Sequence, residues 1–384
     1  MKSWPRRDSD PTCMTTSAEL SAGEATYRAL RRFLFALPPD EAHRMVIGRL
    51  AALDRHPGLC DAAARYRERR SHLGGRVGRI ILDSPLILAA GLVKGEGFLT
   101  EDEAMRAVAA GRNIIPGWRS AGALLGPVEM GTFTPRPRLG NQGQVLWRHT
   151  EAQSLLNRVG LRNPGAAAAA AFLGERSEGL PDVYGISIAS DPDQADPARR
   201  VEEAAEAVRY FAEAGVRPSW TTVNVSCPNV DQGYDLSSLP GEVGDLCRAV
   251  RAELWGASPL WVKVAPDVGR GRYGSIAQAA VEGGAEAIVA TNTAPGRLSG
   301  TEIGVGVGGA SLHGLALEVV EELDSFRTES GTEFEIVGCG GVLDGQSYRD
   351  FLDRGAAAVQ YWSALVFRGP TAPALILAES EEIA

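Results

Sequence analysis

Residues 184–226 read YGISIASDPDQADPARRVEEAAEAVRYFAEAGVRPSWTTVNVS, and this stretch decides the fold. It begins and ends with short runs rich in apolar and β-branched residues, Tyr184–Ala189 and Thr221–Ser226, which have the composition of buried strands. Between them, Pro197–Ala214 follows a helical period. Strand, helix and strand in this order form the repeating unit of a parallel sheet whose faces are covered. The stretch therefore predicts an α/β protein.

The same unit recurs from residue 80 onward. Six further strands are expected at Leu86–Gly91, Pro127–Thr132, Trp261–Ala265, Ala287–Asn292, Glu335–Gly340 and Ala356–Tyr361. Further helices are expected at Glu101–Ala110, Ala166–Leu173, Gly241–Leu254, Ser275–Gly283, Leu315–Phe326 and Gly345–Arg354, and near Pro373–Glu379. Eight strand–helix pairs in about 300 residues favour a closed (β/α)8 TIM barrel over an open doubly wound sheet. The first strand ends in AAGLVK (89–94), which lacks the glycine pattern of a dinucleotide-binding fold.

The segment before the barrel has a different character. Residues 1–24 are polar and without period, which predicts a disordered leader. Residues 25–56 contain two helical stripes separated by Pro38 and Pro39, which predicts an amphipathic helical hairpin, and the barrel domain is expected over residues 70–384. The polar positions of the hairpin are rich in arginine. Two interpretations remain open: the hairpin lies on an anionic membrane surface, or it caps the barrel with solvated arginines.

Composition excludes several classes of protein. The 384 residues carry a formal charge of −9, which argues against nucleic-acid binding driven by net charge. The five cysteines form an odd set without a CxxC pair, so neither a disulfide framework nor a metal site is indicated, and a reducing cytoplasmic location fits. The purest apolar run, Ala166–Leu173, is too short to span a bilayer. The 45 glycines favour many tight turns and close contacts between backbone and ligand.

Polar residues follow most of the expected strands. The active site of such a barrel lies at the C-terminal ends of its strands, so these residues are expected to converge on one rim. A phosphate is suited to the backbone N–H groups of Gly340 and Gly341, which no side chain covers, and to the loop at Trp362 and Ser363. Asparagines suit a planar ring that bears carbonyl and N–H groups, and a lysine suits a carboxylate on that ring; the residues concerned are Asn157, Asn224, Asn229, Asn292 and Lys94. Cys227 is either a base or a small buried apolar residue.

Eight motifs in order resemble those of one family. They are LPPDEAH (37–43), PLILAAGLVK (85–94), GTFTPRP (131–137), LNRVG (156–160), NVSCPN (224–229), VKVAPD (262–267), ATNT (290–293) and VGCGG (337–341). Over about residues 26–370 the chain resembles the dihydroorotate dehydrogenases, and in particular the membrane-associated, quinone-dependent class 2 enzymes.

The resemblance implies a role for each matching residue. FMN is expected against Ala90, Gly91, Thr132, Ser187, Asn224, Lys263, Thr291, Gly309, Gly340, Gly341, Trp362 and Ser363. The substrate is expected against Lys94, Asn157, Gly160, Asn224, Asn229, Asn292 and Thr293. Cys227 is the implied base and Lys263 the cation that stabilises the reduced flavin. His43 and Arg148 match polar positions of a quinone site, which favours peripheral contact with the inner face of the cell membrane.

The chain also departs from the class 2 pattern. Cysteine stands at position 227, where class 2 enzymes have serine and the soluble class 1 enzymes have cysteine. Val93, Val145, Leu161 and Ser187 replace an acid, an arginine, an aromatic residue and an asparagine, and the loop VDQGY (230–234) lacks the usual sequence. The leading interpretation is oxidation of dihydroorotate to orotate with a quinone as acceptor. Alternatives are a related FMN oxidoreductase acting on another cyclic amide or carboxylated heterocycle, a Schiff-base lyase using Lys263, and a flavin-binding protein without catalysis.

Overall fold

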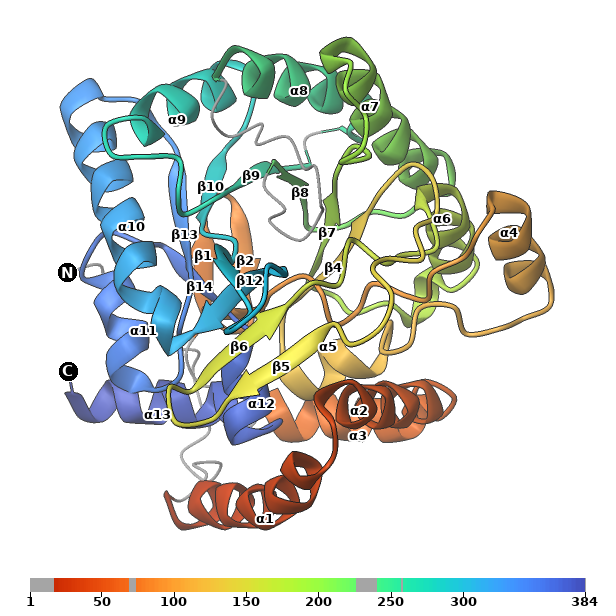
Figure 1. Cartoon of the computed structure of the whole chain (residues 1–384), viewed down its shortest axis with the longest axis vertical. Coiled ribbons are helices and arrows are strands. Elements are labelled where there is room, and N and C mark those ends of the chain that lie inside the picture. Colours follow the sequence, from red (N-terminus) through yellow and green to blue (C-terminus); the bar gives the residue numbers. More distant parts are fainter. Residues whose placement is uncertain (1–16, 69–73, 226–239, 257, 384) are drawn as a thin grey trace.

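The computed structural model describes residues 17–68, 74–225, 240–256 and 258–383. Eight parallel strands form a closed barrel surrounded by helices (Figure 1). In order around the barrel the strands are β3 (Leu86–Leu88), β4 (Val128–Phe133), β7 (Tyr184–Ile188), β8 (Trp220–Asn224), β9 (Leu260–Val264), β10 (Ala287–Ala290), β13 (Glu335–Cys339) and β14 (Ala358–Tyr361). Their spatial order is their order along the chain, and β14 pairs with β3 to close the ring. The predicted (β/α)8 barrel is confirmed, and each predicted strand overlaps an observed one.

Side chains alternate between the two faces of each barrel strand. In β9, Leu260, Val262 and Val264 belong to the core between strands and helices, whereas Trp261 belongs to a second core inside the barrel. The two-residue period of a strand therefore directs Lys263 inward as well. Whether a polar side chain points into the barrel therefore depends on whether it stands at an odd or an even position along its strand.

A short hairpin closes the N-terminal end of the barrel. Strands β1 (Gly75–Val77) and β2 (Ile80–Leu82) pair antiparallel, and their apolar side chains join the inner core. Trp220 and Trp261 stack in this core with ring centroids 4.6 Å apart. Side chains therefore fill the N-terminal half of the barrel. A ligand is expected at the C-terminal end of the strands.

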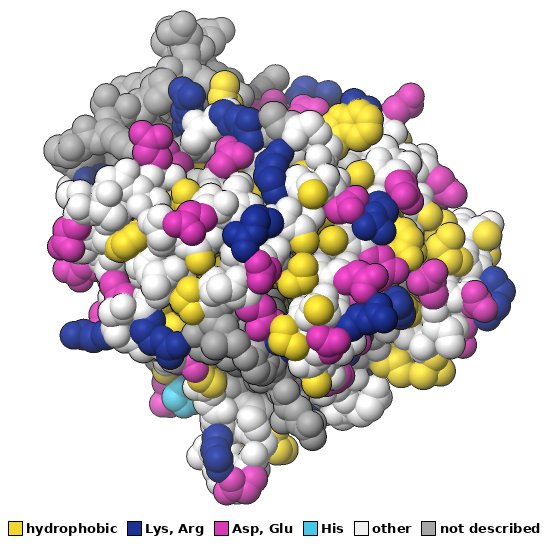
Figure 2. Space-filling model, turned by 90° about the horizontal axis from the view of Figure 1, so that it is seen from above, with side chains coloured by type: hydrophobic (Ala, Val, Ile, Leu, Met, Phe, Trp, Pro, Cys, Tyr) yellow, Lys and Arg dark blue, Asp and Glu magenta, His cyan; other side chains and the backbone are white. Residues whose placement is uncertain are grey.

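The helices outside the barrel are α4 (Glu101–Ala109), α5 (Ser120–Leu125), α6 (Ala166–Gly174), α7 (Pro197–Glu213), α8 (Pro240–Glu253), α9 (Tyr273–Glu282), α10 (Ala310–Ser330), α11 (Gly345–Leu352), α12 (Ser363–Arg368) and α13 (Ala372–Ile383), with a 3-10 turn at Ser177–Gly179. The predicted helices overlap all of these except the short helices α5 and α12 and the 3-10 turn. On the face that carries α7, α8 and α9, basic and acidic side chains are intermixed (Figure 2).

A second sheet, which the sequence did not predict, is built from loops between barrel elements. Its antiparallel strands are β11 (Ala294–Arg297), β12 (Gly304–Gly309), β6 (Ser154–Asn157) and β5 (Leu146–His149). β6 follows β4 in the chain, and β11 and β12 follow β10. Because both insertions start at C-terminal strand ends, this sheet lies on the side of the mouth (Figure 1).

Three helices precede the barrel: α1 (Ser17–Ala36), α2 (Pro39–Leu53) and α3 (Pro57–Glu68). The break between the first two lies at the predicted prolines. One expectation is wrong, since α1 begins at Ser17 and residues 17–24 are helical rather than part of a disordered leader. Residues 1–16 lie outside the described residues. No helix of the described part is long and apolar enough to cross a membrane.

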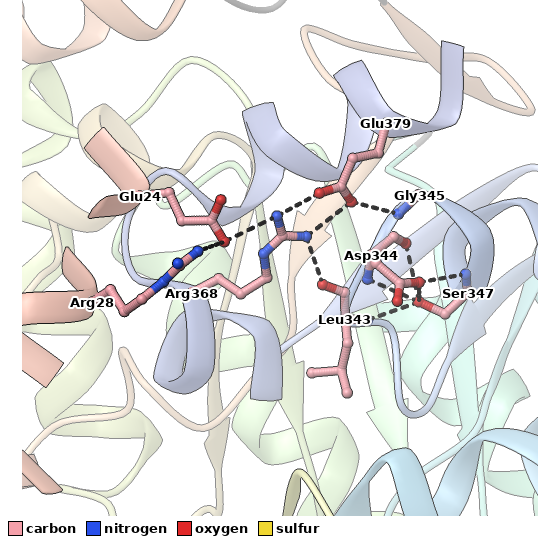
Figure 3. A network of polar contacts seen from close by, with 8 residues as sticks. All are labelled: Glu24, Arg28, Leu343, Asp344, Gly345, Ser347, Arg368 and Glu379. Carbon is pink, nitrogen blue, oxygen red and sulfur yellow. Dashed lines mark hydrogen bonds and ion pairs between the residues drawn. The ribbon is translucent and has the colours of Figure 1, made fainter. Parts of the chain in front are cut away.

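Each N-terminal helix is seated on the barrel domain. α1 packs against α12 and α13, whereas α2 packs against α5 and β5. Arg368 joins the two chain ends, because its guanidinium donates to Glu379 Oε2 at 2.9 Å and lies 3.4 Å from Glu24 Oε1 on α1 (Figure 3). Tyr27 of α1 donates to the Val366 carbonyl at 2.8 Å. The hairpin is thus held by polar contacts as well as by its apolar face.

Candidate active site

Four predicted site residues form a row of polar contacts at the mouth. Thr132 of β4 and Ser187 of β7 share a hydrogen bond of 2.9 Å. Asn224 at the end of β8 donates to Thr132 Oγ1 at 3.3 Å, and Asn292 after β10 donates to Asn224 Oδ1 at 3.5 Å. Residues from the ends of four strands therefore meet on one rim, where the amides of the two asparagines contact each other.

The segment after β10 is held by backbone bonds. Thr291 N donates to the Cys339 carbonyl at 2.6 Å, and Asn292 N donates to the Val264 carbonyl at 2.8 Å. Thr293 N donates to Asn292 Oδ1 at 2.8 Å, which orients that amide. The Thr293 hydroxyl is buried and has no hydrogen-bond partner among the described residues. A buried hydroxyl without a partner is costly, so this oxygen is suited to a bound ligand.

Lys263, the register partner of Asn224 on β9, points into the barrel. Its Nζ donates to Gln360 Oε1 at 2.8 Å and lies 3.5 Å from Cys339 Sγ. Gln360 Nε2 donates in turn to Glu129 Oε2 at 3.2 Å. Burial raises the pKa of the Cys339 thiol, and the nearby Lys263 charge opposes this effect.

Glu129 and Gln360 were missed by sequence reasoning. Each is a polar residue between apolar neighbours of its strand, and the neighbours on both sides pack against the outer helices. The inward direction that follows from strand alternation is the signal that could have found them.

Glycines shape the opposite part of the mouth. Gly309 precedes α10 with φ +85°, and Gly340 and Gly341 after β13 have φ of +148° and +70°. A Cβ on Gly341 would lie 2.7 Å from the Gly309 carbonyl oxygen, so side chains are excluded there. Next to them, a Cβ on Gly91 would lie 3.6 Å from Trp362 Nε1. These glycines form a cradle of backbone groups next to the start of α12 at Ser363, as a phosphate requires.

The remaining residues expected at the cofactor or the substrate follow β3, lie in or after β6, or lie outside the described residues. Ala90, Gly91 and Lys94 follow β3 and are half-buried. Asn157 belongs to β6 of the second sheet and donates to the Gly306 carbonyl at 3.3 Å. Gly160 has φ +70° and lies against Asn141. Cys227 and Asn229 lie outside the described residues; Val225, the last described residue before them, donates to the Lys263 carbonyl at 3.2 Å.

The N-terminal helices approach the same mouth. Arg148 of β5 donates to the Leu34 carbonyl at 3.0 Å and to the Leu37 carbonyl, and it lies 4.5 Å above the Phe35 ring. Burial lowers the pKa of Arg148. On α2, burial lowers the pKa of His43 to about 4, and the charges of Lys94 and Arg162 add to this effect. His43 is therefore neutral at physiological pH and lies within electrostatic range of the expected substrate lysine.

Comparison with known proteins gives the family. Residues 113–383 match the family model described as dihydroorotate dehydrogenase. A Bordetella avium protein named "Dihydroorotate dehydrogenase (quinone)" is 32% identical over 362 residues, covering 90% of this chain and 94% of that protein. A Mycobacterium sp. (strain KMS) protein of the same name is 32% identical and covers 89% of this chain and 90% of its own. The chain belongs to the dihydroorotate dehydrogenase family.

The match to these dihydroorotate dehydrogenases extends beyond the family model. The Bordetella avium relative matches 90% of this chain, which is a larger share than residues 113–383 make up. The similarity to relatives with quinone in their name therefore includes a large part of residues 1–112. A dihydroorotate dehydrogenase of Eimeria tenella, solved in complex with ferulenol, has the same fold with a TM-score of 0.69 at 22% identity, covering 91% of this chain and 94% of that one. Membership confirms the predicted family and the prediction of a dehydrogenase.

Proposed function

We propose that this enzyme oxidises dihydroorotate to orotate with FMN as its cofactor and a quinone as electron acceptor. The observation that carries the proposal is the row Ser187, Thr132, Asn224 and Asn292 at the barrel mouth, together with the buried Lys263, the register partner of Asn224 on β9. The names of its relatives and its membership of the family support the substrate.

The described residues fit FMN on two observations. The glycine cradle at Gly309, Gly340 and Gly341 offers backbone groups where a Cβ would collide, which suits the phosphate. The partnerless Thr293 hydroxyl and the asparagine amides lie on the rim where the planar rings are expected. When bound, FMN supplies the acceptor for the hydride that leaves the substrate ring.

Residues of the chain bind the substrate, remove its proton and stabilise the charge that develops. Asn157, Asn224, Asn229 and Asn292 bind the carbonyl and N–H groups of the substrate ring, and Lys94 binds its carboxylate. Cys227 takes the proton from one ring carbon while the hydride leaves the adjacent carbon, so the ring gains a double bond. Lys263 places a fixed cation beside the cofactor site, where negative charge develops during reduction.

The quinone site is proposed between α1, α2 and β5, next to His43 and Arg148. The neutral His43 imidazole offers a hydrogen bond without the cost of burying a charge. Leu30 and Phe33 on α1 and Leu59 on α3 are exposed apolar side chains, and arginines lie nearby in the sequence. This combination suits a cytoplasmic enzyme that contacts the inner face of the membrane peripherally.

A second candidate is oxidation of another cyclic amide or carboxylated heterocycle, with FMN retained. It is favoured by Leu161, a non-glycine residue with φ +52° in the expected substrate segment, and by Ser187, which bonds Thr132 where an asparagine is expected. A Schiff-base lyase is disfavoured because the Lys263 ammonium group is already bonded to Gln360.

Growth rescue separates the two candidates. A bacterial strain that lacks its own dihydroorotate dehydrogenase and needs added pyrimidine should grow without it when it expresses this protein. The Cys227→Ala variant, expressed to the same level, is the matched control and should not rescue. Failure of the unchanged, flavin-loaded protein to rescue would favour the second candidate.

A further inference from the structure

Below the mouth, the barrel interior holds a carboxylate, an amide and an ammonium group in a row. They belong to Glu129 of β4, Gln360 of β14 and Lys263 of β9. Glu129 and Gln360 are fully buried, and Lys263 is 6% exposed. Lys263 Nζ lies 2.8 Å from Gln360 Oε1, and Gln360 Nε2 lies 3.2 Å from Glu129 Oε2. The amide therefore bridges two groups of opposite charge that do not touch.

The direction of both hydrogen bonds is fixed by the groups at the two ends. A lysine ammonium group only donates, so the end of Gln360 that faces it must be the oxygen. An ionised carboxylate only accepts, so the end that faces Glu129 must be the NH2 group. If the amide rotated by 180°, its NH2 group would face the ammonium group, and two donors would oppose each other in a buried site.

Glu129 is in turn held as an acceptor. Trp220 Nε1 donates to its Oε2 at 2.9 Å, and Thr222 Oγ1 donates to the same oxygen at 2.5 Å. An indole N–H only donates, so Trp220 requires an acceptor at this position. The other oxygen, Oε1, is buried and has no hydrogen-bond partner among the described residues. All three described bonds therefore converge on the oxygen that faces Gln360.

We propose that Glu129 is a positioning residue for Lys263: it fixes the Gln360 amide so that the amide oxygen holds the lysine ammonium group below the cofactor site. Glu129 does not touch the ligands, and its effect passes through Gln360. The inference rests on the proposed function, because Lys263 matters to a flavin only if the mouth binds one. The proposal adds Glu129 and Gln360 to the residues that support the site.

Sulfite binding to the flavin-loaded enzyme reports the position of the lysine. Sulfite adds reversibly to N5 of oxidised flavins and bleaches them, and a nearby cation stabilises the negative charge of the adduct. Glu129→Leu and Gln360→Leu should each weaken sulfite binding by about tenfold or more, as expected for a lost hydrogen bond to a charged group. Glu129→Gln keeps an acceptor oxygen opposite Trp220 and should stay within about threefold of the unchanged enzyme or bind sulfite more tightly.

Trp220→Phe is the matched control. It disturbs the same carboxylate and the same core but leaves the bond between Glu129 and Gln360, so sulfite binding should change less than about threefold. The double variant of Glu129→Leu and Gln360→Leu should be no weaker than Gln360→Leu alone, because the effect passes through one amide. Equal losses in Trp220→Phe and Glu129→Leu, or additive losses in the double variant, would overturn the proposal.

A second measurement does not depend on the flavin. The chain contains three lysines, Lys2, Lys94 and Lys263, so acetylation by acetic anhydride can be followed at each one by mass spectrometry. Acetylation of Lys263 relative to Lys94 should rise by about tenfold in Gln360→Leu, because the amine loses its acceptor, and should stay unchanged in Trp220→Phe. A colourless protein would refute the proposed flavin chemistry but not this ratio. An unchanged ratio in Gln360→Leu would overturn the positioning role itself.

Discussion

At the scale of single residues, Cys227 is the expected base. It lies outside the described residues, three positions after Asn224, the last residue of β8, and β8 ends at the rim. Cys227→Ala removes the proposed base and does not change the glycine cradle at Gly309, Gly340 and Gly341. The variant should bind FMN normally and lose at least about 100-fold in the rate of flavin reduction by substrate, which is the usual size of a general-base contribution. Stopped-flow spectroscopy measures this rate, and near-normal reduction would refute the role.

His43 makes stability depend on pH. Its pKa in the folded protein is about 4, against about 6.5 for an unfolded histidine. Between these values the unfolded chain binds a proton that the folded protein does not, so the free energy of unfolding should decrease as the pH falls from 6.5 to 4. His43→Gln should reduce this slope, as measured by urea unfolding at pH 7 and pH 5. The exposed His149→Gln is the control, and identical slopes in all three proteins would contradict the prediction.

Asp54 fastens α2 to the barrel domain. Its buried carboxylate accepts from Gly117 N at 2.7 Å, Ser120 N at 2.9 Å and Asn113 Nδ2 at 2.8 Å. Asp54→Ala leaves these donors without an acceptor and should lower the free energy of unfolding by about 2–4 kcal/mol. Asp61→Ala on the exposed surface of α3 is the control and should change it by less than about 0.5 kcal/mol. Equal effects of both substitutions in urea unfolding would show that the buried contacts contribute little.

At the scale of elements, α1 is the part of the proposed quinone site that can be removed separately. Deleting residues 1–36 removes α1 and the Leu34 carbonyl that Arg148 binds, while Leu37, α2 and Asp54 stay in place. Reduction of a quinone should fall by about tenfold more than reduction of a soluble dye, since the dye does not need the helix. Steady-state assays with both acceptors test this, and an equal loss of both activities would refute the site between α1, α2 and β5.

The elements that the sequence predicted are those with a strong pattern of their own. Apolar β-branched runs located all eight barrel strands, and long helical periods located α7, α8 and α10. The pattern could not reveal β12, GVGVGG, because glycine-rich residues become a strand there only through pairing with β6 and β11. In α1 the apolar stripe is divided: Leu34 is buried, whereas Leu30 is 52% exposed, since the barrel surface covers only one side of the helix.

For the site, the sequence predicted the rim but not what supports it. The row from Ser187 to Asn292 follows from the rule that polar residues at strand ends meet in a barrel. Glu129 and Gln360 belong to different strands that are 231 positions apart, so only the closed barrel brings them together.

At the scale of the whole molecule, the polar site residues lie at one end of the barrel. The β1–β2 hairpin and the stacked tryptophans fill the N-terminal end, while the second sheet and the N-terminal helices flank the mouth (Figure 1). Substrate, cofactor and quinone are therefore expected at the same end. Under the proposed function, electrons would pass from substrate to quinone through the flavin at this end of the barrel.

The visible spectrum of the purified protein under anaerobic conditions tests this account most directly. We expect a yellow protein whose flavin absorbance is bleached by dihydroorotate and restored by a quinone. The Cys227→Ala variant should stay yellow after dihydroorotate is added. A flavin-loaded protein that dihydroorotate leaves unbleached would contradict the substrate assignment, and a colourless protein would contradict the flavin chemistry itself.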